Sequence, residues 1–307
     1  MAEQLRQYLL LVRLPNAFTA LSNIVVGYFS PTGPANASVF QLSMLMASSA
    51  LLYVSGIIFN DYFDLEVDRK ERPGRPLPSG RVKKKNALVL AVATMVAANI
   101  IALFVSPASL AVCSALAAVV LAYDYGAKKG RMGPAAMGGA RFLNVLLGAS
   151  PALGTGIVVI IIPWNTLVAA GAMFAYVYSI ALLSRKEAGE EAQQKKEKEE
   201  DARKSVAQSF SIISAIIASM ILFAFLHSES FEMFVNIALF SAAMLFTWRG
   251  ARSGSQAQIQ NAVRNLVLFI VVLDSAFITA FAGLPYGIAS LAIMVPPVIL
   301  ARRFYIT

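Results

Sequence analysis

The segment from residue 60 to residue 68 carries an amide and three carboxylates at short, regular intervals. Asn60, Asp64 and Asp68 are four residues apart, and Asp61 follows the first of them. Residues four apart share one face of a helix, so their oxygens could meet at one cation. Magnesium in proteins takes a few carboxylates together with phosphate oxygens of a substrate. We therefore predict a metal site with Asn60, Asp61, Asp64 and Asp68 as ligands, in which Asp64 and Asp68 act in catalysis.

A block of guanidinium groups follows in a proline-rich loop. Arg72, Arg75 and Arg81 come directly after the carboxylates, and three prolines between them stiffen the backbone. Guanidinium groups match phosphate oxygens in geometry and charge. Charges beside an apolar segment can also be a solvated loop and a topology signal. The aspartate spacing together with the Arg-Pro repeat favours a substrate-binding role for these arginines, on a diphosphate.

A second polar loop, near residue 125, combines tyrosines with lysines. Tyr123, Tyr125, Lys128 and Lys129 lie between two apolar runs. A lysine could neutralise a departing diphosphate while a tyrosine hydroxyl donates beside it. The alternative is that these are basic residues at the end of a membrane helix. We predict that Lys128 is catalytic and that the other three bind substrate.

A few polar residues lie inside the apolar runs. Arg141 and Asn144 are three residues apart, and an intramembrane arginine must face protein or water. We predict a catalytic Arg141 and a substrate-binding Asn144, with Asn16 reaching the same cavity. Asp274 could line that cavity more deeply or pair with a neighbouring helix.

A third polar loop begins with Ser184-Arg185-Lys186-Glu187. Glu187 and Glu191 are one helical turn apart and are predicted ligands of a second metal, while Arg185 is predicted to bind substrate. The polar loops after the second, fourth and sixth apolar runs would lie on one side of a membrane. We expect these loops, 61–85, 124–134 and 184–206, to form a cap over the site.

The elements that must position these residues are long apolar segments. Hydrophobic residues make up 58% of the 307 residues, and the mean hydropathy is +0.66. Ten runs are close to the length that a helix needs to cross hydrocarbon. They are residues 14–29, 41–59, 86–104, 107–123, 135–160, 164–183, 207–226, 231–248, 262–283 and 285–301. We predict an all-α, polytopic bundle of nine, possibly ten, spans around a central cavity, forming one domain over residues 1–307.

The distribution of charge predicts the orientation and excludes some functions. The basic residues gather in alternate loops, which the positive-inside rule places in the cytoplasm together with the N-terminus. This rule accounts for the net charge of +9 without a nucleic-acid partner. Cys113 is the single cysteine and His227 the single histidine, which argues against disulfides and against zinc chemistry based on these residues.

The motifs resemble those of the UbiA superfamily of intramembrane prenyltransferases. Asn60 to Asp68 matches the pattern N-D-x-x-D-x-x-x-D, and the Arg-Pro segment that ends Pro-Ser-Gly-Arg81 follows it as in the family. The loop at 123–129 is similar to the family's Tyr/Lys loop, and Arg13-Leu-Pro-Asn16 resembles its N-terminal helix. Where most members carry a second Asp-rich motif, this chain has the Ser-Arg-Lys-Glu segment at 184–187, which looks closest to the EboC-like branch.

The resemblance implies a helical fold of about nine spans and Mg²⁺-dependent transfer of a prenyl group. The donor would be an isoprenyl diphosphate whose tail enters from the membrane lipids. Metal and basic groups would stabilise the diphosphate as the allylic C–O bond ionises, and an apolar cavity would keep water from the carbocation. The acceptor, an aromatic compound, another small molecule or a lipid, stays open. A carrier or flippase for a prenylated or phosphorylated lipid, using the same cavity, is the alternative function.

Overall fold

A computed structural model describes residues 2–153, 162–185, 195–227, 231–252 and 255–296, and all regular structure within these ranges is helical. The helices are α1 (Ala2–Leu11), α2 (Leu14–Phe29), α3 (Val39–Phe63), α4 (Leu65–Glu71), α5 (Lys84–Val105), α6 (Pro107–Tyr125), α7 (Gly133–Ala149), α8 (Trp164–Ser184), α9 (Lys195–His227), α10 (Phe231–Ala251), α11 (Gln256–Leu268), α12 (Ile270–Ala282) and α13 (Leu284–Leu291). Three short 3₁₀ helices are η1 (Ala127–Lys129), η2 (Ser150–Ala152) and η3 (Ala292–Met294).

The predicted apolar runs correspond to helices, although fewer of them pass a strict test for a membrane span. Within the described ranges, seven helical segments are long and apolar enough to cross a bilayer. They are α3, α5, α6, α8, Asp201–Phe225 of α9, α10, and Gln256–Ala282, which combines α11 and α12. The apolar parts of α2 and α13–η3 are shorter. An all-helical membrane bundle is therefore present, while the predicted count of nine or ten spans is not confirmed.

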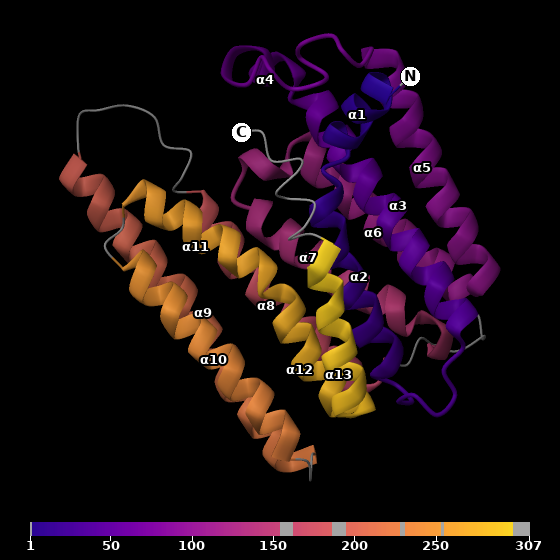
Figure 1. Ribbon diagram of the computed structural model, residues 1–307, viewed down its shortest axis with the longest axis vertical. Helices are drawn as coiled ribbons and strands as arrows, with labels where there is room; N and C mark the ends of the chain where they lie inside the picture. Colours follow the sequence, from indigo (N-terminus) through magenta and orange to yellow (C-terminus); the bar gives the residue numbers. More distant parts are fainter. Residues whose placement is uncertain (1, 154–161, 186–194, 228–230, 253–254, 297–307) are drawn as a thin grey trace.

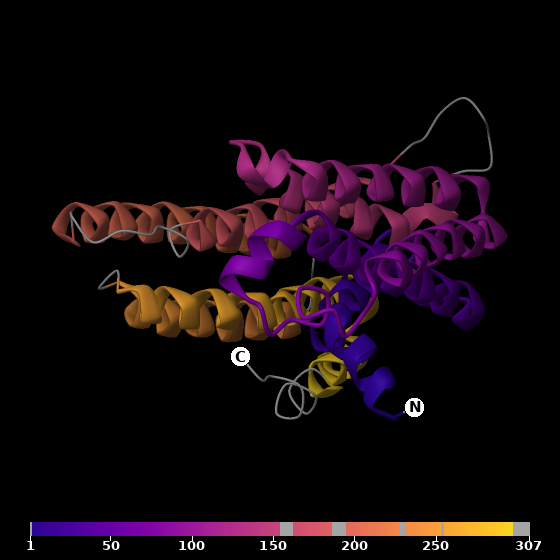
Figure 2. The same ribbon diagram turned by 90° about the horizontal axis from the view of Figure 1, so that it is seen from above.

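The helices are arranged so that α2 and α7 occupy the middle of the bundle. Helix α2 packs against α3, α7 and α12, and α7 also packs against α6 and α8. Figure 1 shows α3, α5 and α6 on one side of this centre and α9 and α10 on the other, while α4 and the N-terminal α1 lie at one end of the bundle. Figure 2, seen from above, shows α9 and α10 extending away from the N-terminal helices.

The outer face of α5 is apolar and exposed. Val89, Val92, Val96, Ile100 and Leu103 follow one another at helical spacing, and each is at least 46% exposed. A soluble protein rarely leaves such a continuous apolar stripe uncovered. This apolar face of α5 is therefore suited to contact with membrane lipid.

Glycines allow α2 and α7 to touch backbone to backbone. A Cβ atom added to Gly27 would clash with the carbonyl oxygen of Val145, and one added to Gly148 would clash with that of Ile24. Small residues at such a contact are typical of helix pairs in membranes, since they let the backbones approach closely. The contact fixes the register between the polar residues of α2 and those of α7.

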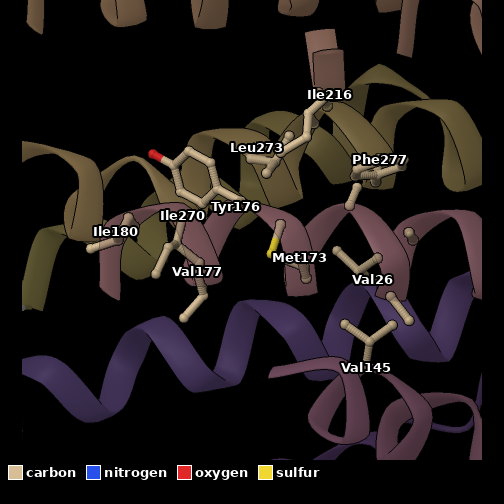
Figure 3. Close-up of a cluster of buried hydrophobic side chains, with 14 of the residues drawn as sticks. Val26, Val145, Met173, Tyr176, Val177, Ile180, Ile216, Ile270, Leu273 and Phe277 are labelled. Atoms are coloured by element: carbon tan, nitrogen blue, oxygen red, sulfur yellow. The ribbon is translucent and has the colours of Figure 1, made fainter. Parts of the chain in front are cut away.

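Large apolar side chains fill the space between α8 and α12. Figure 3 shows Met173, Tyr176 and Val177 of α8 facing Ile270 and Leu273 of α12, with α2 and α7 below them. The Tyr176 hydroxyl donates to the carbonyl oxygen of Leu266 at 2.9 Å. This hydrogen bond satisfies the single polar atom of the tyrosine side chain in an otherwise apolar core. Val177 and Ile270 of this core also line a cavity between the helices.

Candidate active site

A cavity of about 420 Å³ opens between the central helices. Helices α2, α3, α6 and α7 supply most of its wall, and Val177, Ile180, Val267 and Ile270 close it from the side of α8, α11 and α12. Its polar lining includes Arg13, Asn60, Tyr123, Asp124, Arg141 and Asn144. The predicted central cavity is thus present, and it has charged groups at one end and apolar side chains along its length.

At the mouth of the cavity, Lys128 joins two residues of the first predicted cluster. Its Nζ atom lies 2.9 Å from Oδ1 of Asn60 and 2.5 Å from Oδ2 of Asp64. Asn60 is in the last turn of α3, Asp64 caps that helix, and Lys128 is in η1. The fold therefore brings the first and second polar loops together, as the sequence predicted.

A second group of ion pairs forms beside the first. Arg75 Nη1 lies 2.6 Å from Oδ2 of Asp68 and 3.5 Å from Oδ1 of Asp61. The same Oδ1 atom of Asp61 accepts from Arg13 Nη2 at 2.5 Å. Arg13 has a left-handed backbone conformation, with φ 44° and ψ 48°, between α1 and α2. Such a conformation is uncommon for a residue with a side chain and marks a constrained position.

The predicted single acidic face is divided into two pairs of residues. Helix α3 ends at Phe63, Asp64 has non-helical φ and ψ angles of −89° and 5°, and α4 starts at Leu65. Because the helix is interrupted at Asp64, Asn60 and Asp64 converge on Lys128 while Asp61 and Asp68 converge on Arg75. The prediction assumed one continuous helix with all four side chains on one face. The structure instead has two separate groups, one around Lys128 and one around Arg75.

The oxygens of Asn60 and Asp64 suit a hard cation, because both already converge on one positive charge, the ammonium of Lys128. Within the described parts of the chain, no cluster of three or more Asp, Glu, His or Cys side chains is close enough to hold a metal ion. The described residues thus offer the oxygens of Asn60 and Asp64 as a partial donor set for a hard cation.

Deeper in the cavity, Arg141 anchors a buried network between α2, α7 and α12. Its guanidinium donates to the carbonyl oxygen and the hydroxyl of Thr19, both at 2.9 Å, and to Oδ1 of Asn23 at 3.0 Å. The amide of Asn23 donates to Oδ2 of Asp274 at 2.7 Å. Of the two possibilities for Asp274, pairing with a neighbouring helix is the one observed. The positive Arg141 and the carboxyl group of Asp274 are thus linked through the side-chain amide of Asn23.

Asn144 holds a similar position one turn further along α7. Its amide donates to the carbonyl oxygen of Ala20 at 2.7 Å, and its Oδ1 accepts from the Ser49 hydroxyl at 2.7 Å. The side chain therefore links α7 to α2 and α3 at the cavity wall. Arg141 and Asn144 lie on one face, as predicted from their spacing.

The remaining predicted residues are distributed around the mouth. Tyr123 lines the cavity, whereas Tyr125 is 81% exposed and contacts the ring of Phe63. Arg72 and Arg81 are exposed and are not part of the cavity lining.

Arg185 is exposed and donates to the backbone oxygens of Lys128 and Gly130, so it supports the loop that presents Lys128. Glu187 and Glu191 lie outside the described residues, as do the side chains of Asn16 and Lys129.

Sequence reasoning gave no site role to Arg13, Asn23 and Asp124. The partners of Arg13 and Asn23 are far away in the chain, so the sequence gives no local signal for them. Asp124 received no role because attention went to the tyrosines and lysines of the same loop. An aspartate near the end of an apolar run is, however, a candidate functional residue on sequence grounds alone.

Comparison with known families identifies the family and the fold. The profile of the UbiA prenyltransferase family matches residues 19–273, which is most of the chain. The chain belongs to the UbiA prenyltransferase family. The motifs at Asn60–Asp68 had indicated the same family.

Two relatives of this UbiA protein are digeranylgeranylglyceryl phosphate synthases. The enzyme of Ignicoccus hospitalis is 33% identical over 126 residues, which cover 41% of this chain and 40% of that enzyme. The enzyme of Methanocaldococcus jannaschii is 32% identical over 106 residues, which cover 34% of this chain and 36% of that enzyme. The chain thus matches only about two fifths of the length of these curated relatives.

Solved structures of UbiA homologues share the fold. The apo structure of a homologue from Aeropyrum pernix aligns with a TM-score of 0.70 at 17% identity, covering 88% of this chain and 99% of the other. A homologue from Archaeoglobus fulgidus bound to DMAPP and Mg²⁺ aligns with a TM-score of 0.67 at 17% identity, covering 93% and 99%. At this identity the similarity establishes the helical architecture.

Proposed function

We propose that this UbiA protein transfers a prenyl group from a polyprenyl diphosphate to an aromatic or lipid acceptor inside the membrane, with Mg²⁺ as cofactor. The observation that carries the proposal is the position of Lys128. Its ammonium joins Asn60 and Asp64 at the mouth of an apolar cavity, with Arg75 and Arg13 on the neighbouring carboxylates. Opposite charges are therefore concentrated where an apolar tail and a diphosphate would meet.

The chain's own residues divide into two roles at the mouth. Lys128, Arg75 and Arg13 would bind diphosphate oxygens, because cationic donors form short, strong hydrogen bonds with phosphate. Asn60 and Asp64, with Asp61 and Asp68 beside them, would hold Mg²⁺, which neutralises charge on the departing diphosphate when it is bound.

The interior of the cavity would protect the reacting carbon. Leu52, Leu116, Val120, Ile180 and Ile270 contribute apolar wall between the mouth and the Arg141 network. An apolar wall excludes water, which would otherwise capture the allylic cation before the acceptor does. The charged groups would then act only at the end where the diphosphate departs.

The orientation and the acceptor belong to the same proposal. The basic loops, the site and the N-terminus would face the cytoplasm under the positive-inside rule, with the whole chain acting as one domain. A lipid acceptor of the prenylglyceryl phosphate type is supported by the names of the relatives, which are digeranylgeranylglyceryl phosphate synthases.

The test is magnesium-dependent release of diphosphate from geranyl, farnesyl and geranylgeranyl diphosphates by the protein in lipid nanodiscs. We expect release by the wild type and by Glu66→Gln, whose side chain is exposed on α4. We expect loss of release in Asp64→Asn. Binding of the donors without turnover, even with a total lipid extract present, would contradict the enzyme and favour the carrier.

A further inference from the structure

Asp124 is a buried carboxylate of the cavity wall to which the roles above assign nothing. It is in the last turn of α6 and is 3% exposed. Among the described residues that line the cavity, it is the only carboxylate. A carboxylate in this position requires a partner, because an ionised oxygen buried without one costs several kcal/mol.

The structure gives one oxygen of this carboxylate no partner. Oδ2 of Asp124 is buried and forms no hydrogen bond with any described residue. On the facing helix, α3, a Cβ added to Gly56 would lie 4.0 Å from this oxygen and 2.7 Å from Cγ1 of Val120, so the glycine lets α6 pack closely against α3 at this level. Asp124 itself lines the cavity, which is the side from which a polar group of a bound molecule would approach Oδ2.

Three other polar groups of the cavity already have protein partners. Asn60 is bonded to Lys128, Arg13 to Asp61, and Asn144 to Ser49. Asp124 therefore differs from these neighbours in keeping an acceptor atom available, and the difference indicates a ligand.

Its place along the helices locates Asp124 next to the reacting carbon. Lys128 meets Asn60 at the mouth, and Gly56, which faces Asp124, precedes Asn60 by four positions in the same helix, α3. Four residues of a helix make about one turn, so the Asp124–Gly56 level lies about one turn further into the cavity than the diphosphate-binding level. The allylic carbon is bonded directly to the diphosphate and must lie at this boundary.

We infer that Asp124 binds the hydroxyl group of the acceptor and accepts its proton during transfer. The inference rests on the proposed function and narrows the acceptor to a compound with a hydroxyl group, and a lipid alcohol is the class that the relatives' names support. The C–O bond between the allylic carbon and the diphosphate breaks, and its electron pair leaves with the diphosphate. The acceptor oxygen forms a new C–O bond to that carbon, and its proton moves to Oδ2 of Asp124. The products are an ether lipid and diphosphate.

The experiment separates ionisation from transfer. The protein in nanodiscs receives geranylgeranyl diphosphate, Mg²⁺ and geranylgeranylglyceryl phosphate as the alcohol, and both diphosphate and ether lipid are measured. For Asp124→Asn, loss of a general base predicts ether formation about 100-fold slower or worse. Magnesium-dependent release of diphosphate, measured with azide present to capture the cation, should stay near the wild-type rate, because breaking the allylic C–O bond does not require the base. Glu66→Gln is the matched control for loss of one acidic charge.

A nucleophile that carries no proton distinguishes a general base from a residue that only supports the fold. Azide captures an allylic cation without needing a base, so Asp124→Asn should form prenyl azide as fast as the wild type. If Asp124→Asn does not fold, Asp124→Ser, which has a smaller polar side chain, is used instead. It should likewise form ether slowly and prenyl azide at the wild-type rate.

Each contrary outcome has a distinct meaning. If release, ether formation and azide capture fall together, Asp124 serves the diphosphate site or the fold, and the inference is overturned. If the wild type releases diphosphate but makes no ether, the alcohol acceptor is wrong while the prenyltransferase proposal stands. If the wild type releases no diphosphate, the proposed function itself fails.

Discussion

The charged mouth of the cavity and the buried network below it use the same residue types in different ways. At the mouth, cations contact carboxylates directly, with 2.5 Å between Lys128 and Asp64 and 2.6 Å between Arg75 and Asp68. Below, Arg141 contacts oxygens of Thr19 and Asn23, and the carboxylate of Asp274 is reached only through the amide of Asn23.

For the Lys128–Asp64 pair the difference follows from access to water, whereas the carboxylates of Asp61 and Asp68 beside it are buried. Lys128 and Asp64 are 14% and 22% exposed, so water or an incoming ligand can replace either partner. The Arg141 network lies between helices, where each broken hydrogen bond would leave a polar group unpaired in an apolar setting. We conclude that the mouth is built for exchange of partners and that the deeper network fixes the helices. The predictions below test that contrast.

The largest effect is expected from Asp64→Asn at the mouth. The substitution keeps the shape and removes the charge that would stabilise the metal and diphosphate, so turnover should fall about 100-fold or more. Thermal stability should change little, because Asp64 is partly exposed. Diphosphate release and a thermal melt of the same sample measure both. A large drop in melting temperature would contradict the contrast, since it would make the mouth structural.

Arg141→Leu should show the reverse pattern, with a pronounced loss of stability. It removes the guanidinium that donates to Thr19 and to the buried Oδ1 of Asn23, and losing such buried hydrogen bonds costs about 1–3 kcal/mol. Unfolding in detergent, followed by circular dichroism, measures the loss. Arg69→Leu, on the exposed surface of α4, is the matched control. A variant as stable as the wild type would show that the network is not what fixes α2 to α7.

A smaller effect should rank the arginines of the second loop. Arg75 contacts Asp61 and Asp68, whereas Arg72 and Arg81 are exposed. Hydrogen bonds to charged groups contribute about 1.5–3 kcal/mol, so Arg75→Ala should weaken diphosphate binding by about 10- to 100-fold. Arg72→Ala and Arg81→Ala should weaken it less. Titration with a non-hydrolysable prenyl diphosphonate gives the order, and equal effects would contradict it.

Local sequence patterns predicted the helices and the charged residues at the mouth of the cavity, because both depend on short segments of the chain. Apolar runs of membrane length became helices, and the first two polar loops met through Lys128 and Asp64. The interruption at Asp64 was not visible, since helical spacing continues through it in the sequence. The Asn23–Asp274 bond was also out of reach, because it joins residues 251 positions apart and depends on how the helices pack.

The glycine contact between α2 and α7 limits how the cavity can change its capacity. Gly27 and Gly148 each face a backbone oxygen of the other helix, and a backbone atom, unlike a side chain, has no alternative rotamer. These two helices can therefore come no closer. The capacity of the cavity therefore depends on the side chains that line it, such as Leu52 of α3 and Met137 and Ala140 of α7, and not on the spacing of the α2 and α7 backbones.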